Sequence, residues 1–242
     1  MASTYHTARV VYSGFATGST STSQQNPSYG HLEAAHYAAK YLAGTKTLGI
    51  YFTSTNRHTM EAFLHFPLSP KIHAMSDANW GPQDASRTVS NTPLPLFVSR
   101  SMSAFFIDLL GPLHWVSKRQ AVTAVSSAEA EIYATSECVR FLLELVQILQ
   151  FLGVRDTFMP GTNIIFNDNQ ACVNWSHSCT SKGLRHIQMK ENHVRENIAS
   201  DFISIQHIEG KLNLADIFTK KMKDVSHFVE LRDIIMCHRF LS

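Results

Sequence analysis

The sequence predicts an α/β fold in which helices pack on a mixed β-sheet. From Lys71 onward, strand-like runs and helical repeats follow one another in the order three strands, helix, strand, helix, helix, strand, helix. The composition fits a folded protein, because 44% of the 242 residues are hydrophobic and 17% are charged. The chain is therefore expected to bury a substantial core around one sheet.

The first seventy residues differ in texture from the rest of the chain. After a strand-like run at 8–12 and a Ser/Thr/Gly-rich stretch, residues 29–48 show a helical pattern with Gly44 as a natural stop. Residues 49–53 are typical of a short strand. Proline residues near position 70 then indicate a boundary.

The sheet is expected to begin after this boundary. We predict strands at 71–77, 95–102 and 113–118, although the apolar run 104–110 is ambiguous between strand and helix. A long helix is predicted from Ser126 to Leu152, because Gly153 ends its periodic pattern.

The second half of the chain alternates between strands and helices. A buried strand at 162–167 leads into a helix at 169–175, and another helix is predicted at 184–199. A strand at 202–207 and a helix capped by Asn213 complete the order.

Four acidic residues lie where these elements begin or end: Asp77, Glu131, Asp168 and Asp216. Each alone fits a turn, a helix cap or a dipole-stabilised first helical turn. Gathered by the fold, they would make a site for Mg²⁺ or Mn²⁺, which prefer oxygen ligands. The four together therefore predict a divalent-metal centre.

Helical periodicity separates Glu131 from its neighbour Glu129. Steps of three and four from Glu131 reach a mostly apolar stripe, whereas the same steps from Glu129 reach polar residues. We therefore expect Glu131 to face the sheet and Glu129 to face water. A buried carboxylate needs a metal ion or a cationic partner.

Other chemistry is less well supported. The four cysteines form no C-x-x-C pair, and a zinc site from Cys172, His177, Cys179 and His186 has no matching ligand spacing. No apolar run approaches the roughly twenty residues that span a bilayer. We expect an intracellular protein with no membrane partner and no small-molecule cofactor.

Several motifs, in collinear order, resemble the ribonuclease H domain of copia-type retrotransposon Pol polyproteins. They are S-D-A-N-W (76–80), W-V-S-K-R-Q (115–120), S-S-A-E-A-E-I-Y-A (126–134), F-N-D-N-Q-A (166–171), R-H-I-Q-M-K-E-N-H-V-R-E (185–196) and L-A-D-I-F-T-K (214–220). Residues 31–49 resemble the segment that closes the reverse transcriptase in the same polyproteins. A polymerase Y-x-D-D motif is absent from the sequence, so copying of nucleic acid is not expected.

The resemblance implies a ribonuclease H-like fold, a five-stranded mixed sheet flanked by helices, that cuts the RNA strand of an RNA–DNA hybrid with two metal ions. Its D-E-D-D ligand set corresponds to Asp77, Glu131, Asp168 and Asp216, and His207 is the candidate for an assisting histidine. Expected nucleic-acid contacts are Lys118, Arg119, Asn169, Lys182, Arg185 and Arg195.

The predicted organisation has three parts. Residues 1–70 are a remnant of the reverse transcriptase connection, 71–222 the ribonuclease H-like domain, and 223–242 a helical tail. The reverse transcriptase domain is the expected partner in the parent polyprotein. The resemblance also implies a cytoplasmic location within a virus-like particle, or a nuclear location. Two alternatives are a catalytically silent remnant that at most binds nucleic acid, and another nuclease of the same superfold such as an integrase or resolvase.

Overall fold

The computed structural model describes residues 29–52, 56–65, 72–81, 100–177, 185–220 and 222–236. Its strands are β1 (His73–Asn79), β2 (Met102–Asp108), β3 (Pro112–Arg119), β4 (Asn163–Asn167) and β5 (Ile203–His207). Its helices are α3 (Tyr29–Gly44), α4 (Asn56–Leu64), α5 (Ser127–Phe151), α6 (Arg155–Phe158), α7 (Gln170–Ser176), α8 (Arg185–Ala199), the 3-10 turn η2 (Gly210–Leu212), α9 (Asp216–Thr219) and α10 (Val225–Ile235).

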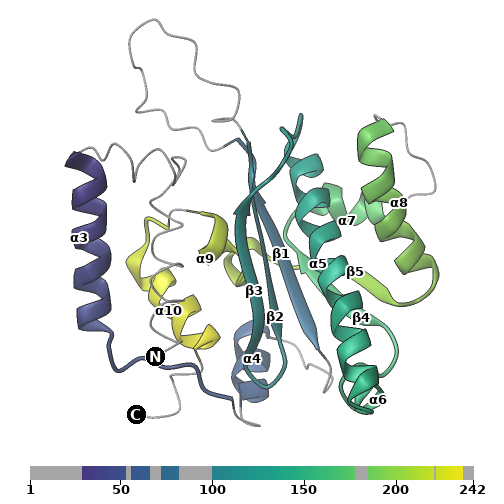
Figure 1. Cartoon of the computed structure of the whole chain (residues 1–242), viewed down its shortest axis with the longest axis horizontal. Helices are drawn as coiled ribbons and strands as arrows, with labels where there is room; N and C mark the ends of the chain where they lie inside the picture. Colours follow the sequence, from purple (N-terminus) through teal and green to yellow (C-terminus); the bar gives the residue numbers. More distant parts are fainter. Residues whose placement is uncertain are drawn as a thin grey trace, which may run out of the picture.

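The five strands form one mixed sheet in the order β3-β2-β1-β4-β5 (Figure 1). Strand β2 runs antiparallel to both β1 and β3. Strands β1, β4 and β5 run parallel to one another. The predicted α/β class and five-stranded mixed sheet are confirmed.

Helices cover both faces of the sheet (Figure 1). Successive strand residues point to opposite faces, so Met75 and Phe106 pack with α4, α9 and α10. Their neighbours Ala74 and Phe105 pack with α5, α7 and α8 on the other face. The sheet is therefore the middle layer of three, and its central strands are buried on both sides.

The predicted position of the second strand was wrong. The strand is β2, at 102–108, and not 95–102, of which residues 95–99 lie outside the described part. All seven residues of β2 are buried, because both faces of the sheet are covered. A strand buried on both faces has no alternation of polar and apolar residues, which is why the apolar run 104–110 was ambiguous.

Two differences concern the segment before the sheet. Residues 49–52 form no strand, which corrects the prediction for 49–53, and the run at 8–12 lies outside the described residues. Helix α4 was not predicted, yet Met60 and Leu64, spaced one helical turn apart, are both 2% exposed and belong to the core around α9 and α10. The three-part division of the chain stays a prediction.

Candidate metal centre

Two aspartates meet at one edge of the sheet because of the pairing between β1 and β4. These strands are parallel, and Ser76 is the register partner of Asn167. Asp77 follows Ser76 on β1, and Asp168 follows Asn167, which is the last residue of β4. In parallel strands, residues that follow a paired position lie side by side, so the two carboxylates come together although they are far apart in sequence.

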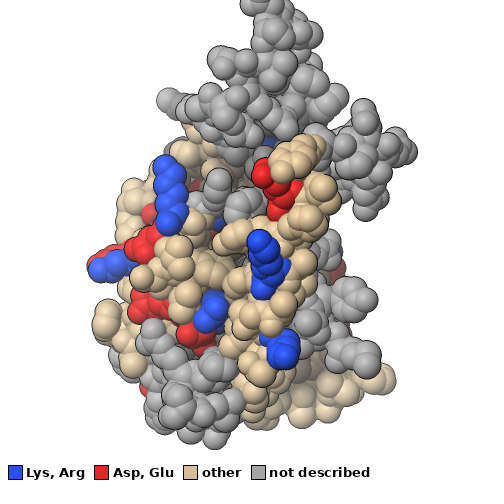
Figure 2. Space-filling model, turned by 90° about the vertical axis from the view of Figure 1, so that its left-hand side faces the viewer, with Lys and Arg blue, Asp and Glu red and all other residues tan. Residues whose placement is uncertain are grey.

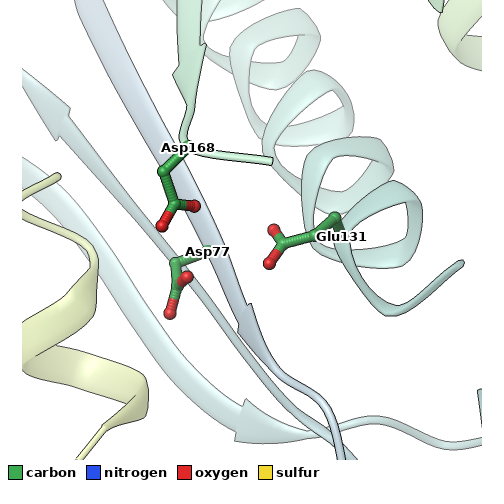
Figure 3. A group of neighbouring side chains, drawn as sticks. All are labelled: Asp77, Glu131 and Asp168. Carbon is green, nitrogen blue, oxygen red and sulfur yellow. The ribbon is translucent and has the colours of Figure 1, made fainter. Parts of the chain in front are cut away.

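Helix α5 adds a third carboxylate. It packs on β1 and β2, and Glu131, 4% exposed, projects from its second turn toward the two aspartates (Figure 3). One oxygen from each of Asp77, Glu131 and Asp168 lies within 4.8 Å of the others. The structure therefore brings together three of the four predicted ligands as one compact group.

The fourth carboxylate, Asp216, joins the group through a lysine. The Lys220 ammonium lies 2.6 Å from Asp216 Oδ1, 3.1 Å from Asp77 Oδ1 and 3.6 Å from Asp168 Oδ2. Asp216 begins the one-turn helix α9, and Lys220 follows its last residue. Four carboxylates and one ammonium thus share a small volume at the sheet edge.

Side-chain amides and a hydroxyl hold the carboxylates in place. Asn167 donates from Nδ2 to Glu131 Oε2 over 2.9 Å, and Asn213 donates to the Ser76 carbonyl over 3.0 Å. Thr219 Oγ1 donates a short hydrogen bond to Asp77 Oδ2. These contacts orient the acidic side chains before any ion binds, which is the usual function of groups behind a metal ligand.

The helix cap predicted at Asn213 was wrong in detail. Ala215 is the residue that precedes α9, and Asn213 instead ends η2. Asn213 Oδ1 accepts from the Ala215 N–H over 3.1 Å, and its amide faces the acidic group. Asn213 therefore connects the backbone before Asp216 to Ser76, the residue next to Asp77.

Burial and mutual repulsion dominate the electrostatics of the group. Burial, and then the charge of Asp77, raises the pKa of Asp216 to about 7. The same two causes raise the pKa of Glu131 well above its usual range. Burial also raises the pKa of Asp77, while the Lys220 charge and the Thr219 hydrogen bond act against this. The single Lys220 ammonium does not neutralise all four carboxylates, and a bound divalent cation would supply the remaining positive charge.

These shifts predict that the metal-free protein loses stability as the pH rises toward neutrality. A carboxyl with a raised pKa in the folded state holds a proton that the unfolded chain releases from about pH 4. Its contribution is fully present below the unfolded pKa and is lost as the pH rises through the folded value, about 7 for Asp216. We expect thermal unfolding without metal to shift to lower temperature between pH 5 and pH 8, and Mg²⁺ to remove most of this shift.

Asp216→Asn is the control for this measurement. The variant lacks the titrating group, so its unfolding temperature is expected to depend less on pH over the same window. Histidines act in the opposite direction, since burial lowers the pKa of His114, and this background is common to both proteins. An equal pH dependence in the two proteins would contradict the assignment.

The prediction that Glu129 faces water was wrong, because Glu129 is only 4% exposed. Its Oε2 accepts from the Val125 N–H over 2.6 Å, and its own N–H donates to Ser126 Oγ over 3.1 Å. This is a variant of the capping box at the start of α5, in which the carboxylate accepts from the residue before the N-cap Ser126 and not from the N-cap N–H itself. The S-S-A-E run carries that signal, which apolar periodicity does not detect.

Two of the predicted nucleic-acid contacts, Lys118 and Arg119, lie on β3. The exposed Lys118 pairs with Glu137 on α5 over 2.8 Å, and Arg119 is half-buried. His207 is exposed at the end of β5, as the register partner of Asn167 next to Asp168.

The remaining predicted contacts lie around α7 and α8. Asn169 Oδ1 caps α7 by accepting from the Cys172 N–H over 3.1 Å. The Arg195 guanidinium lies over the Trp175 ring, 4.8 Å from its centroid. Lys182 and the side chain of Arg185 lie outside the described part of the chain. Nucleic-acid contact by these residues stays a prediction.

Sequence reasoning missed four residues that contact the acidic group or hold it in place: Asn167, Asn213, Thr219 and Lys220. All four lie within the short runs that carry the acidic residues, F-N-D-N-Q-A and N-L-A-D-I-F-T-K. Their sequence proximity to an acid was visible, but the contact of Thr219 with Asp77 joins residues 142 positions apart. Only the fold brings those partners together.

No family model matches the chain, but similar proteins are known. It is 26% identical over 212 residues to the retrovirus-related Pol polyprotein from transposon RE1 of Arabidopsis thaliana, covering 86% of this chain and 12% of the relative. It is 25% identical over 206 residues to the corresponding polyprotein from transposon TNT 1-94 of Nicotiana tabacum, covering 85% and 13%. The chain thus spans about an eighth of the length of these relatives.

Solved structures with a similar course of the chain include ribonucleases H. Ribonuclease H1 of Halobacterium salinarum is 13% identical with a TM-score of 0.39, covering 66% of this chain and 98% of that one. The N-terminal ribonuclease H domain of a Mycobacterium tuberculosis protein is 10% identical with a TM-score of 0.42, covering 68% and 98%. The relatives in sequence are thus Pol polyproteins of transposons, and the five-stranded mixed sheet flanked by helices is the architecture that the motif resemblance led us to expect.

Proposed function

We propose that this protein is a metal-dependent ribonuclease H that hydrolyses the RNA strand of an RNA–DNA hybrid. The observation that carries the proposal is the group of Asp77, Glu131 and Asp168, whose oxygens lie within 4.8 Å of one another. The relatives of this chain are Pol polyproteins of transposons, and the motifs in its sequence resemble the ribonuclease H domain of such proteins.

The residues present fit Mg²⁺ or Mn²⁺. All the donors are carboxylate oxygens, the ligand type that these ions prefer, and Asp77 is fully buried while Asp168 is partly accessible. Asp77, Glu131 and Asp168 would hold one ion, and Asp77, Asp168 and Asp216 a second. Two such ions supply activation of a water on one side of a phosphodiester and stabilisation of the leaving oxygen on the other.

The chain's own groups prepare this site. Asn167 fixes the Glu131 carboxylate and Thr219 fixes that of Asp77, so little reorganisation is needed when an ion binds. A bound ion would keep Asp77, Glu131 and Asp216 deprotonated, because its positive charge would offset the burial and repulsion that raise the pKa values of these three carboxyls. His207, exposed beside this edge, stays the candidate for an assisting histidine.

Basic side chains lie close to α5, the helix that carries Glu131. Lys118 and Lys190 both lie near Glu137, and the charges of Lys118 and Arg140 help to lower the pKa of Lys190, after burial as the main cause. The Lys190 ammonium also lies over the Tyr133 ring, 4.2 Å from its centroid. We assign phosphate contacts to this group, while RNA would be distinguished by its 2′-hydroxyls.

The opposite side of the molecule also carries charges of both signs. Figure 2 shows the face formed by α3 and α10, where Lys and Arg side chains lie among Asp and Glu side chains. Charge alone does not distinguish the two sides, since Lys118 and Arg140 near α5 also pair with Glu137 and Glu144. We place the hybrid on the side of α5 and β3 because α5 carries Glu131 of the metal centre. Of the described helices, none is long and apolar enough to cross a bilayer.

The test is cleavage of an RNA–DNA hybrid with the RNA strand labelled. We expect the chain to cut the hybrid in Mg²⁺ or Mn²⁺ and to lose this activity in excess chelator, since the carboxylates alone supply no Lewis acid. The corresponding DNA duplex and single-stranded RNA are expected to stay intact. Metal-independent cleavage, or equal cutting of all three substrates, would contradict the proposal. Binding of the hybrid without cleavage would support the catalytically silent alternative.

A further inference from the structure

Lys220 occupies an unusual position for a lysine, inside a group of carboxylates that the proposed function assigns to metal ions. Its ammonium is within 4.0 Å of three of them, with Asp216 closest at 2.6 Å and Asp77 at 3.1 Å. The third, Asp168, is 3.6 Å away. Among the described ion pairs, Lys220 has none with the fourth acid, Glu131. Asp77 and Asp168, which lie beside Glu131 in space, both contact the lysine.

The backbone that carries Lys220 is held firmly. Its N–H donates to the Asp216 carbonyl over 2.9 Å, which closes the single turn of α9. Ser117 Oγ on β3 donates to the Phe218 carbonyl over 2.6 Å, and Phe218 itself is 3% exposed in the core. These contacts fix the backbone of Lys220 beside the sheet edge, within reach of the carboxylates.

The side chain itself has a route out. Lys220 is 37% exposed, whereas the side chain of Asp77 is 1% exposed. Lysine has four rotatable side-chain bonds and a strongly hydrated head group. Its ammonium can therefore move into solvent by rotamer changes while α9, Asp77 and Asp216 stay in place.

The carboxylates form two overlapping sets that share Asp77 and Asp168. One set adds Glu131, and the lysine contacts only its two aspartates among the described ion pairs. The other adds Asp216 and is the one that the ammonium bridges. An ammonium and a divalent ion compete for the same oxygens, and they repel each other strongly at a separation of a few ångströms.

We propose that the Lys220 ammonium is an internal counter-ion for the Asp77–Asp168–Asp216 position, and that a divalent ion binds there only after Lys220 has swung out. This inference rests on the proposed function. It makes the two metal positions unequal, because the ammonium contacts all three acids of the set with Asp216 but only the two shared aspartates of the set with Glu131. The metal-free protein in turn keeps its buried acids partly neutralised.

The test is a Mn²⁺ titration of the whole chain by calorimetry, comparing wild type, Lys220→Met and Lys211→Met. Methionine keeps the length of the side chain and removes the charge. We expect Lys220→Met to bind the weaker of two Mn²⁺ ions about tenfold more tightly, which corresponds to about 1.4 kcal/mol. Lys211→Met removes the same charge from an exposed pair with Glu209, 3.1 Å apart, and is expected to match wild type.

A second measurement needs no variant and holds if Lys220→Met folds poorly. Acetic anhydride labelling of wild type, read by mass spectrometry, should modify Lys220 several-fold faster when Mg²⁺ is added, while labelling of Lys211 stays constant. Identical Mn²⁺ isotherms together with unchanged Lys220 labelling would overturn the inference and leave the proposed function intact. Absence of Mn²⁺ binding in all three proteins would overturn both.

Discussion

Glu131→Gln is expected to reduce Mg²⁺-dependent cleavage of an RNA–DNA hybrid by about a thousandfold, or roughly 4 kcal/mol of transition-state stabilisation. The glutamine has the same shape but lacks the charge that would bind the ion shared with Asp77 and Asp168. Folding should not suffer, because Asn167 can donate to a glutamine oxygen as it does to Glu131 Oε2. Removal of a buried, repelled charge is expected to leave the metal-free protein as stable as wild type or more stable.

Glu129→Gln is the matched control, two residues away on the same helix. Glu129 is equally buried, but its carboxylate caps the start of α5 by accepting from the Val125 N–H. We expect this variant to lose about 0.5–1 kcal/mol of stability through a weaker cap. Its cleavage at a temperature where it is folded should stay within about twofold of wild type. Equal losses of activity in the two variants would show that the contrast between them is wrong.

Asp168→Asn is expected to reduce cleavage by about a hundredfold or more, because Asp168 belongs to both overlapping sets of carboxylates. Its effect on stability should depend on metal. Without metal, removal of one of several like charges should leave the unfolding temperature unchanged or higher. With Mg²⁺, the variant should lose most of the stabilisation that wild type gains from binding, about 1.4 kcal/mol at an ion concentration ten times the dissociation constant.

Asp156→Asn serves as the comparison. Asp156 is 88% exposed and pairs only with the neighbouring Arg155 among the described ion pairs, so its loss should change neither cleavage nor the response to Mg²⁺. The measurements are initial cleavage rates and thermal unfolding with and without Mg²⁺ for wild type and both variants. A normal Mg²⁺-induced shift in Asp168→Asn would exclude Asp168 as a ligand.

Much of the fold could be predicted because its elements carry local signals. The helix α5 shows a long periodic pattern that ends at Gly153, and the predicted order of strands and helices after the boundary matches the observed one apart from the short helix α6, which was not predicted. The prediction failed for β2, because burial on both faces removes the alternation of polar and apolar residues. It also failed for α4, because only a few apolar residues attach this helix to the core. Periodicity reports one-sided burial, so it carries little information about an element that is covered on both sides.

The candidate site shows the same division. Apolar periodicity placed Glu131 toward the sheet, and the structure places it there. The same reasoning placed Glu129 in water, where it is not, because a capping carboxylate is buried by its backbone partners and not by apolar packing. Lys220 was visible only as the last residue of the motif L-A-D-I-F-T-K, and nothing local indicated that it would contact Asp77.

By itself, the sequence determined the α/β class, the order of most elements and the four acidic residues at their ends, since these depend on local propensity and spacing. The tertiary structure alone decided which of those acids share one volume. The parallel register of β1 and β4 places Asp77 beside Asp168, and packing of α9 brings Thr219 to a carboxylate 142 residues away. It also decided that an ammonium neutralises part of the group, because charges buried together must find a partner that the fold can reach.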